Sequence, residues 1–103
     1  MTRVLIALGG NAIKQSNEEG TTENQLRNCQ ITAKLLAQIV QNMGDDDRLV
    51  LTHGNGPQAG NLLVQQEMAK NVVPAHPMDV VGAMTQGQIG YMLQQTITNN
   101  LLD

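Results

Sequence analysis

Residues 4–11 read Val-Leu-Ile-Ala-Leu-Gly-Gly-Asn, and this stretch decides the fold class. Its five apolar residues show no alternating polar face, which is typical of a strand buried on both sides of a parallel sheet. A second, shorter apolar run, from Leu49 to Leu51, precedes Gly54. We therefore expect an α/β fold in which two strands each end in a glycine-containing loop.

A helix is predicted between these two strands. Apolar residues recur there at steps of three and four, which marks one face of a helix. Thr21 or Thr22 caps its start, and Gly44 ends it. Because a helix of this length connects the strands, we expect them to be parallel, with a right-handed crossover. The predicted buried face consists of Leu26, Cys29, Ala33, Leu36, Val40 and Met43.

Two more helices are predicted in the second half of the chain. The first covers residues 58–70, with Leu62, Leu63 and Met68 on its apolar side, and a loop follows at 72–77. The second starts with Pro77 as its first residue and runs toward Leu101. Three glycines inside it each cost about 1 kcal/mol relative to alanine, which predicts a break or close packing, either within the subunit or against a second one. They are Gly82, Gly87 and Gly90.

Composition limits both the core and the classes of function. The 103 residues make one small domain or part of a larger one. Tyr91 is the only aromatic residue, so we expect four methionines (68, 78, 84 and 92) to fill gaps in the core. A net charge of −3 provides no basic surface for nucleic acid or anionic lipid. We expect no nucleic-acid partner and no membrane partner.

The chain also shows the pattern of an intracellular protein. The apolar run at its amino end is too short for a signal peptide. The single cysteine, Cys29, cannot form an internal disulfide, which favours a reducing compartment. We therefore expect a cytoplasmic protein.

Both predicted strands are followed by a short loop of glycine and asparagine residues. Residues 9–11 follow the first strand and residues 54–56 the second, so both loops are expected at the carboxyl edge of the sheet, where open α/β folds bind ligands. Glycines let backbone N–H groups approach an anion, the asparagine amide adds a donor, and the helix after Pro57 directs its positive amino end there. Either motif alone is also typical of a turn, but the pair favours a phosphate site. The predicted phosphate-binding residues are Gly9, Gly10, Asn11, Gly54, Asn55 and Gly56.

Three segments resemble successive signatures of carbamate kinases, within the amino acid kinase superfamily. They are residues 7–12 (ALGGNA), 53–58 (HGNGPQ) and 86–91 (QGQIGY), and residues 22–28 and 77–80 fit the pattern between them. The resemblance covers almost the whole chain. It implies the amino-terminal part of a three-layer α/β fold with a mainly parallel sheet, so that residues 1–103 form a partial amino acid kinase domain.

The resemblance also implies an activity, namely reversible phosphoryl transfer between ATP and carbamate to give ADP and carbamoyl phosphate. In that family the loop matching residues 9–11 holds the transferred phosphoryl group, and the loop matching 54–56 lines the carbamate and phosphate side. The complete enzymes use ATP or ADP with Mg²⁺, are homodimers and commonly act in arginine metabolism.

Carbamate kinases are about three times this length, and their catalytic lysines and nucleotide-binding loop belong to the part beyond these residues. We therefore expect no catalytic residue and no metal ligand in this chain, which alone should be inactive. The alternative is a non-catalytic remnant that binds a phosphorylated anion or a partner subunit.

The remaining chemistry-bearing side chains have structural interpretations. Lys14 follows the first glycine loop but lies in a polar segment, which favours a solvated lysine. His53 could serve as a general base, although a hydrogen-bonded role that orients the loop is favoured. His76 is expected in a loop, and Cys29 as a buried, inert thiol. Residues 45–47 are three aspartates without calcium-loop spacing, which favours a solvated turn.

Overall fold

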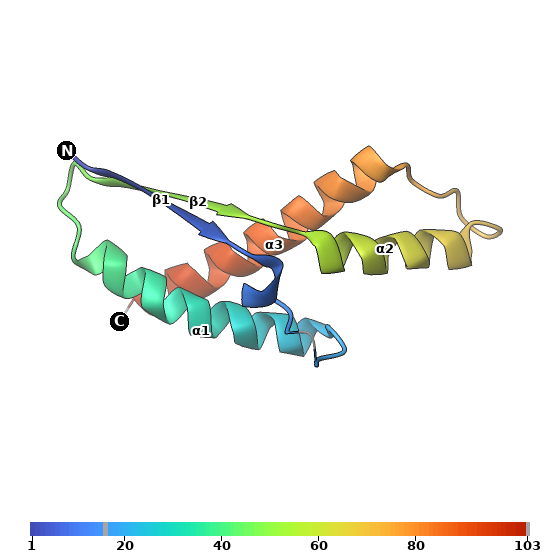
Figure 1. Cartoon of the computed structure of the whole chain (residues 1–103), viewed down its shortest axis with the longest axis horizontal. Helices are drawn as coiled ribbons and strands as arrows, with labels where there is room; N and C mark the ends of the chain where they lie inside the picture. The colour runs from blue at the N-terminus through green and yellow to red at the C-terminus, as the bar shows by residue number, and fades with distance from the viewer. Residues whose placement is uncertain (16, 103) are drawn as a thin grey trace.

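The computed structural model describes residues 1–15 and 17–102, without the side chain of Asn11. Figure 1 shows two strands side by side, one helix that continues outward from the second strand, and two helices that cross each other. The expected strands and helices are all present, so the α/β class is confirmed. In chain order they are β1 (Arg3–Leu8), the 3-10 turn η1 (Gly10–Ala12), α1 (Thr22–Gln41), β2 (Arg48–His53), α2 (Gly56–Ala69) and α3 (Met78–Leu101).

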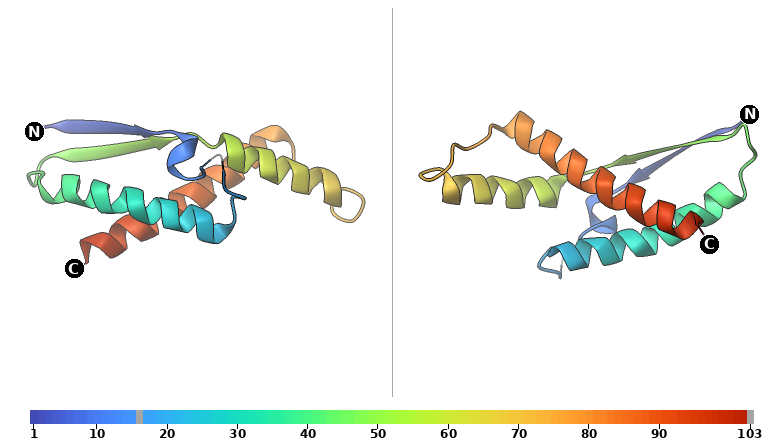
Figure 2. Two further views of the ribbon diagram at one scale, coloured as in Figure 1. Left: turned by 60° about the horizontal axis from the view of Figure 1, so that its bottom comes forward. Right: turned by 180° about the vertical axis from the view of Figure 1, so that it is seen from behind.

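The two strands are parallel, as predicted, and they end level with each other. Their register runs from Arg3 opposite Arg48 to Leu8 opposite His53. The expectation that the strands are buried on both sides is wrong for this chain, because Leu5 and Val50 are 68% and 50% exposed. Helices α1 and α3 lie on one side of the strands (Figure 2, left), so the other face is open.

The core lies between α1, α3 and the turn η1. Ile13, Cys29 and Ile89 are fully buried there, together with Met92 and Leu93, and Leu8 packs against them from β1. The periodic face predicted for α1 is confirmed, with buried positions at Cys29, Ala33 and Leu36.

The methionine prediction is right for one residue and wrong for three. Met92 is 5% exposed, whereas Met68, Met78 and Met84 are 82%, 65% and 41% exposed. Met68 lies near the end of α2, and Met78 is the first residue of α3. These two helix ends project away from the core (Figure 1), so the core does not cover either methionine. Met68 is therefore not on a buried side of α2.

The helix ends differ from the predictions by a few residues. Thr21 caps α1 as expected: its hydroxyl accepts from the Asn24 N–H at 3.1 Å, while the Asn24 side chain accepts from the Thr21 N–H at 3.3 Å. The helix ends at Gln41, three residues before Gly44. Helix α2 begins at Gly56 rather than Gln58, and Pro77 precedes α3 as its N-cap.

The glycines of α3 correct a further expectation. A Cβ built on Gly82, Gly87 or Gly90 would meet no heavy atom of the described chain within 4 Å. The helix runs without interruption from Met78 to Leu101. The glycines therefore mark neither a break nor close packing within this chain, and packing against a second subunit stays a prediction.

The molecule is elongated, with extents of 53 × 26 × 22 Å. Its radius of gyration, 15.7 Å, exceeds the value of about 13 Å that is typical of a compact domain of 100 residues. Among residues 1–15 and 17–102, no helix combines the length and apolar character needed to cross a bilayer.

Candidate anion-binding site at the strand ends

The two glycine loops meet at the carboxyl edge of the sheet, as predicted. The Gly54 N–H donates to the Leu8 carbonyl at 3.0 Å, directly after the last strand pair. A Cβ on Gly54 would lie 3.7 Å from the Gly10 nitrogen, and a Cβ on Gly10 only 3.2 Å from Cδ of Pro57. Glycine at residue 10 therefore lets the first loop pack against the start of α2.

Backbone N–H groups gather at this junction without partners. In η1 the carbonyls of Gly9 and Gly10 accept from Ala12, Ile13 and Lys14 at 2.9–3.1 Å, while the Gly10 N–H has no partner among the described residues. The first hydrogen bond of α2 runs from Ala59 to the Asn55 carbonyl at 2.8 Å, and the N–H groups of Gly56 and Gln58 have no partner among the described side chains and backbone. The amino end of a helix carries partial positive charge, so this end of α2 suits an anion.

Asn55, the predicted amide donor of the second loop, bonds to another helix. It is the N-cap residue of α2, yet its side chain makes no capping hydrogen bond. Instead Nδ2 donates to Oγ1 of the buried Thr85 on α3 at 2.8 Å. One donor of the amide is therefore already used. The side chain of Asn11, the other predicted amide, lies outside the described residues.

Lys14, the cation nearest the first loop in the sequence, is held by its own segment. Its Nζ donates to the Gln15 carbonyl at 3.2 Å, and its methylenes would lie 3.0 Å from a Cβ on Gly20. This arrangement supports the structural interpretation of Lys14.

Asn28 is a buried polar residue that the sequence analysis did not single out as functional. Its Nδ2 donates to the Ile13 carbonyl and to Oε1 of Glu18, both at 2.8 Å. Asn28 thereby ties the segment that follows η1 to α1. Two signals were available: its place directly before Cys29, at the edge of the apolar stripe, and its place in residues 22–28, which fit the family pattern.

Glu18 completes this anchor. The Gln15 N–H donates to its carboxylate at 2.9 Å, and this bond, followed by the one from Asn28, holds the pKa of Glu18 below its ordinary value. Arg27 adds a weak ion pair at 3.9 Å.

We expect the lowered pKa of Glu18 to make part of the stability dependent on pH. A carboxyl whose pKa is lower in the folded state stabilises the fold above its ordinary pKa of 4.5, and this contribution is lost as the pH falls through the folded-state pKa. Urea unfolding between neutrality and acid pH should therefore show a smaller acid loss for Glu18→Gln than for the unsubstituted chain. Glu19→Gln, at the exposed neighbouring carboxylate, is the control. An equal acid loss in Glu18→Gln and the unsubstituted chain would contradict this role.

Three glutamines join the helices beside the loops. Gln25 of α1 donates through Nε2 to the Gly20 carbonyl at 2.8 Å, and its Oε1 accepts from Gln88 of α3 at 3.0 Å and from Gln58 of α2 at 3.3 Å. We call this the glutamine cluster. It borders a polar cavity of about 380 Å³. Oε1 of Gln58 is buried and has no partner among the described residues.

Gly20 has a positive φ of 82°, where L side chains are strained. We expect Gly20→Ala to lower the free energy of unfolding by about 1–2 kcal/mol, because of that strain and the Lys14 contact. Urea denaturation measures the change. Gly87→Ala, in a helix with open space around the new Cβ, is the matched control and should not destabilise. Equal stability of both variants would show that the turn at Gly20 tolerates a side chain.

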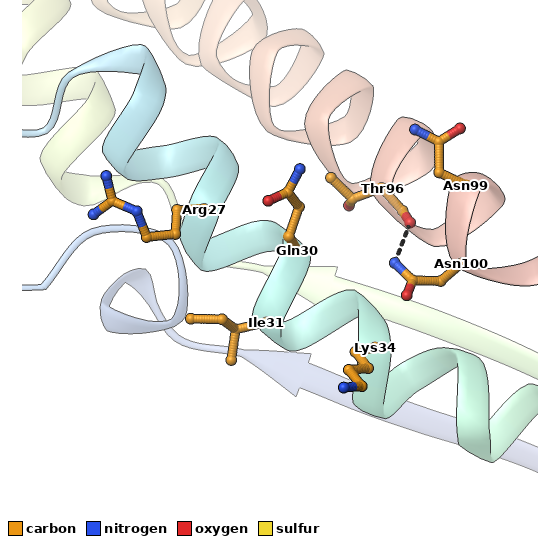
Figure 3. A pocket seen from close by; sticks show the side chains of 7 residues that line it. All are labelled: Arg27, Gln30, Ile31, Lys34, Thr96, Asn99 and Asn100. Atoms are coloured by element: carbon orange, nitrogen blue, oxygen red, sulfur yellow. Dashed lines mark hydrogen bonds between the residues drawn. The ribbon is translucent and has the colours of Figure 1, made fainter.

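A second cavity, of about 430 Å³, lies between α1 and α3. Figure 3 shows its lining side chains, which come from both helices; Nδ2 of Asn100 donates to the Thr96 carbonyl at 2.8 Å. The two cations beside it, Arg27 and Lys34, extend in different directions. They do not converge on a common point, so this hollow lacks the charge arrangement of an anion site.

The remaining candidates have structural contacts. His53 donates from Nδ1 to the Gly54 carbonyl at 3.2 Å, which agrees with a role in orienting the loop. His76 is exposed in the loop before α3. Cys29 is fully buried, and burial raises the pKa of its thiol. Asp47 accepts from the N–H groups of Thr2 and Gly44 at 2.7 and 2.8 Å, and these bonds, the Gly44 bond foremost, lower its pKa.

Parallel strands that end in facing glycine loops, next to the amino end of a helix, define an α/β protein with a candidate anion site at its sheet edge. The family model described as "Amino acid kinase family" matches residues 2–103. The chain belongs to the amino acid kinase family.

Several similar relatives and solved structures are carbamate kinases. A carbamate kinase of Thermococcus kodakarensis is 53% identical over 103 residues, covering 98% of this chain and 32% of the relative. One of Haemophilus influenzae is 48% identical over 97 residues, covering 94% of this chain and 30% of the relative. The structure of carbamate kinase from Giardia lamblia bound to AMP-PNP is 43% identical, with a TM-score of 0.86, and covers 94% of this chain and 33% of that one. The chain thus spans about a third of the length of the relatives it matches, and the amino acid kinase fold of this third is confirmed.

Proposed function

We propose that this chain provides the carbamate and phosphate side of a carbamate kinase, which transfers a phosphoryl group reversibly between ATP and carbamate. The observation that carries the proposal is the meeting of the two glycine loops at the free amino end of α2. Identity of 53% to a carbamate kinase supports it and selects the substrate class.

In this proposal the chain acts by positioning and by fixed dipoles. The free N–H groups of Gly10, Gly56 and Gln58 donate to oxygens of the transferred group, on which negative charge spreads in the transition state. Glycine at residues 9 and 10 lets that group approach the backbone. Carbamate attacks through an oxygen that is already anionic, so the reaction needs no strong base. His53 accordingly orients the second glycine loop through its hydrogen bond to the Gly54 carbonyl.

The nucleotide and Mg²⁺ are assigned to the rest of the family domain. Within residues 1–15 and 17–102, no three His, Cys, Asp or Glu side chains come together as metal ligands. Loops 9–11 and 54–56 also contain no carboxylate, the ligand that Mg²⁺ usually takes from a protein, so these loops do not fit a Mg²⁺ site of their own. A homodimer and a place in arginine metabolism belong to the same proposal and rest on the family resemblance, whereas the proposed cytoplasmic location rests on the single cysteine, Cys29.

The test is formation of ATP from ADP and carbamoyl phosphate by the protein as its native source expresses it, with its intact mass recorded. We expect activity in a protein about three times the mass of this chain, and none in the purified 103-residue chain. Activity of the 103-residue chain alone would overturn the assignment of catalysis to the remaining part. A longer native protein without this activity would overturn the proposed function.

A second candidate function is supported by the open face of the sheet. Leu5 and Val50 are exposed side by side on parallel strands, and such a face favours association. If the native protein has 103 residues, we infer a non-catalytic remnant that binds a phosphorylated anion or a partner subunit. Carbamoyl phosphate binding without ATP formation, in a native protein of this length, distinguishes this candidate.

A further inference from the structure

Asn55 is held in one orientation by a chain of hydrogen bonds from α3. The Gly82 carbonyl can only accept, so the Thr85 hydroxyl donates its single hydrogen there, at 2.9 Å. Oγ1 of Thr85 is then an acceptor, and the Asn55 atom 2.8 Å away must be the amide nitrogen. Because Thr85 is fully buried, water does not compete for this bond.

This fixed orientation leaves a specific group of Asn55 unused. The acceptor Oδ1 lies at the other corner of the planar amide, and it does not cap α2 as an N-cap asparagine usually would. Among the described residues no donor is bonded to Oδ1, and it is not one of the buried unpaired atoms. The second loop thus carries an amide carbonyl acceptor on Asn55, the residue that directly precedes Gly56 at the start of α2.

A carbonyl acceptor repels phosphate oxygens but binds N–H groups. We propose that Oδ1 of Asn55 accepts a hydrogen bond from the amino group of carbamate or carbamoyl phosphate, and that Thr85 positions it for this task. This inference rests on the proposed function and adds a basis for specificity. The donors of the loops bind the phosphoryl oxygens, while Asn55 distinguishes an amino group from an isosteric methyl group.

Acetyl phosphate tests the inference because a methyl group replaces the amino group of carbamoyl phosphate. Binding of carbamoyl, acetyl and inorganic phosphate to the protein as its native source expresses it is followed through the backbone amide NMR signals of the glycine loops. One hydrogen bond predicts that carbamoyl phosphate binds about three- to tenfold more tightly than acetyl phosphate. Thr85→Val, which keeps the side-chain shape but frees the Asn55 amide, should remove this preference. Thr85→Ser, which keeps the hydroxyl, should retain it.

The results of these titrations test the role of Asn55 and the role of Thr85 separately. Equal affinities of the unsubstituted chain for carbamoyl and acetyl phosphate would overturn the inference and leave the proposed phosphate site standing. A preference that persists in Thr85→Val would overturn the positioning role of Thr85. Failure of all three ligands to shift the loop signals would overturn the inference, whereas the proposed function is tested separately by ATP formation from ADP and carbamoyl phosphate in the native protein. Circular dichroism of both variants verifies that they fold.

Discussion

Gly9→Val is expected to weaken the binding of carbamoyl phosphate by at least about tenfold, because one blocked set of charge-assisted hydrogen bonds is worth roughly 1.5–3 kcal/mol. Gly9 is exposed at the start of the first loop, and a Cβ built on it meets no heavy atom within 4 Å. In our account this open space is where the ligand approaches the Gly10 N–H. A valine there would place its Cβ in this space without a close contact to the described residues.

The same change should leave the fold intact. Gly9 has φ −74° and ψ 164°, an extended conformation that valine adopts readily. The free energy of unfolding should therefore stay within about 0.5 kcal/mol of the unsubstituted value, as for other surface positions. Binding is measured by NMR titration and stability by urea unfolding. Gly87→Ala, on α3 with equally open space, is the control and should leave binding unchanged. Undiminished affinity in Gly9→Val would remove the first loop from the site.

Gln25→Met is expected to destabilise the chain by about 3 kcal/mol, because it leaves several buried polar groups without partners. The side chain keeps its length, but Gln58 and Gln88 lose the acceptor that they share, and the Gly20 carbonyl loses its donor. Gln25 and Gln58 are only 7% and 5% exposed, so water does not readily replace the bond between these two side chains. The measurement is the free energy of unfolding from urea denaturation.

Gln58→Met is the matched comparison within the glutamine cluster. It removes the buried Oε1 that has no partner among the described residues, while Gln25 keeps its bond from Gln88. Its cost should stay within about 1 kcal/mol, since an unsatisfied buried acceptor is itself unfavourable. Equal destabilisation by the two substitutions would contradict the hydrogen-bond directions assigned to the cluster.

The sequence predicts the elements and their order because each depends on local pattern. The run from Val4 to Leu8 and the three- and four-residue steps through Cys29 determine a strand and a helix face without reference to the rest of the chain. The parallel pairing follows from the length of the connecting helix, and it brings Gly10 beside Gly54. That the two loops meet was therefore predictable.

The predictions from sequence were wrong for residues whose burial depends on another element of the structure covering them. Leu5, Met68 and Met78 have the composition of core residues, yet they are exposed because no element of this chain reaches them. Gly82 and its neighbours in α3 likewise have open space where close packing was expected. Local pattern states which residues favour burial, but the partner that buries them belongs to the tertiary structure.

The hydrogen-bond partners of the side chains at the site could not be predicted from the sequence either. Asn55 was expected to donate to an anion, and its bond to Thr85 spans 30 positions along the chain. The contacts of Asn28 and Gln88 likewise join separate elements. The residue types indicated that amide side chains lie at the edge of the sheet. Only the packing of α3 against α1 and α2 determines whether the oxygen or the nitrogen of each amide stays free.

The most direct test of the account is an NMR titration of the unsubstituted 103-residue chain with carbamoyl phosphate, followed at the backbone amides. The account predicts saturable shifts of Gly10, Gly54, Gly56 and Gln58 that share one dissociation constant. Signals that stay unchanged in these loops, or shifts confined to the cavity between α1 and α3, would contradict the assignment of the phosphate site to the facing glycine loops.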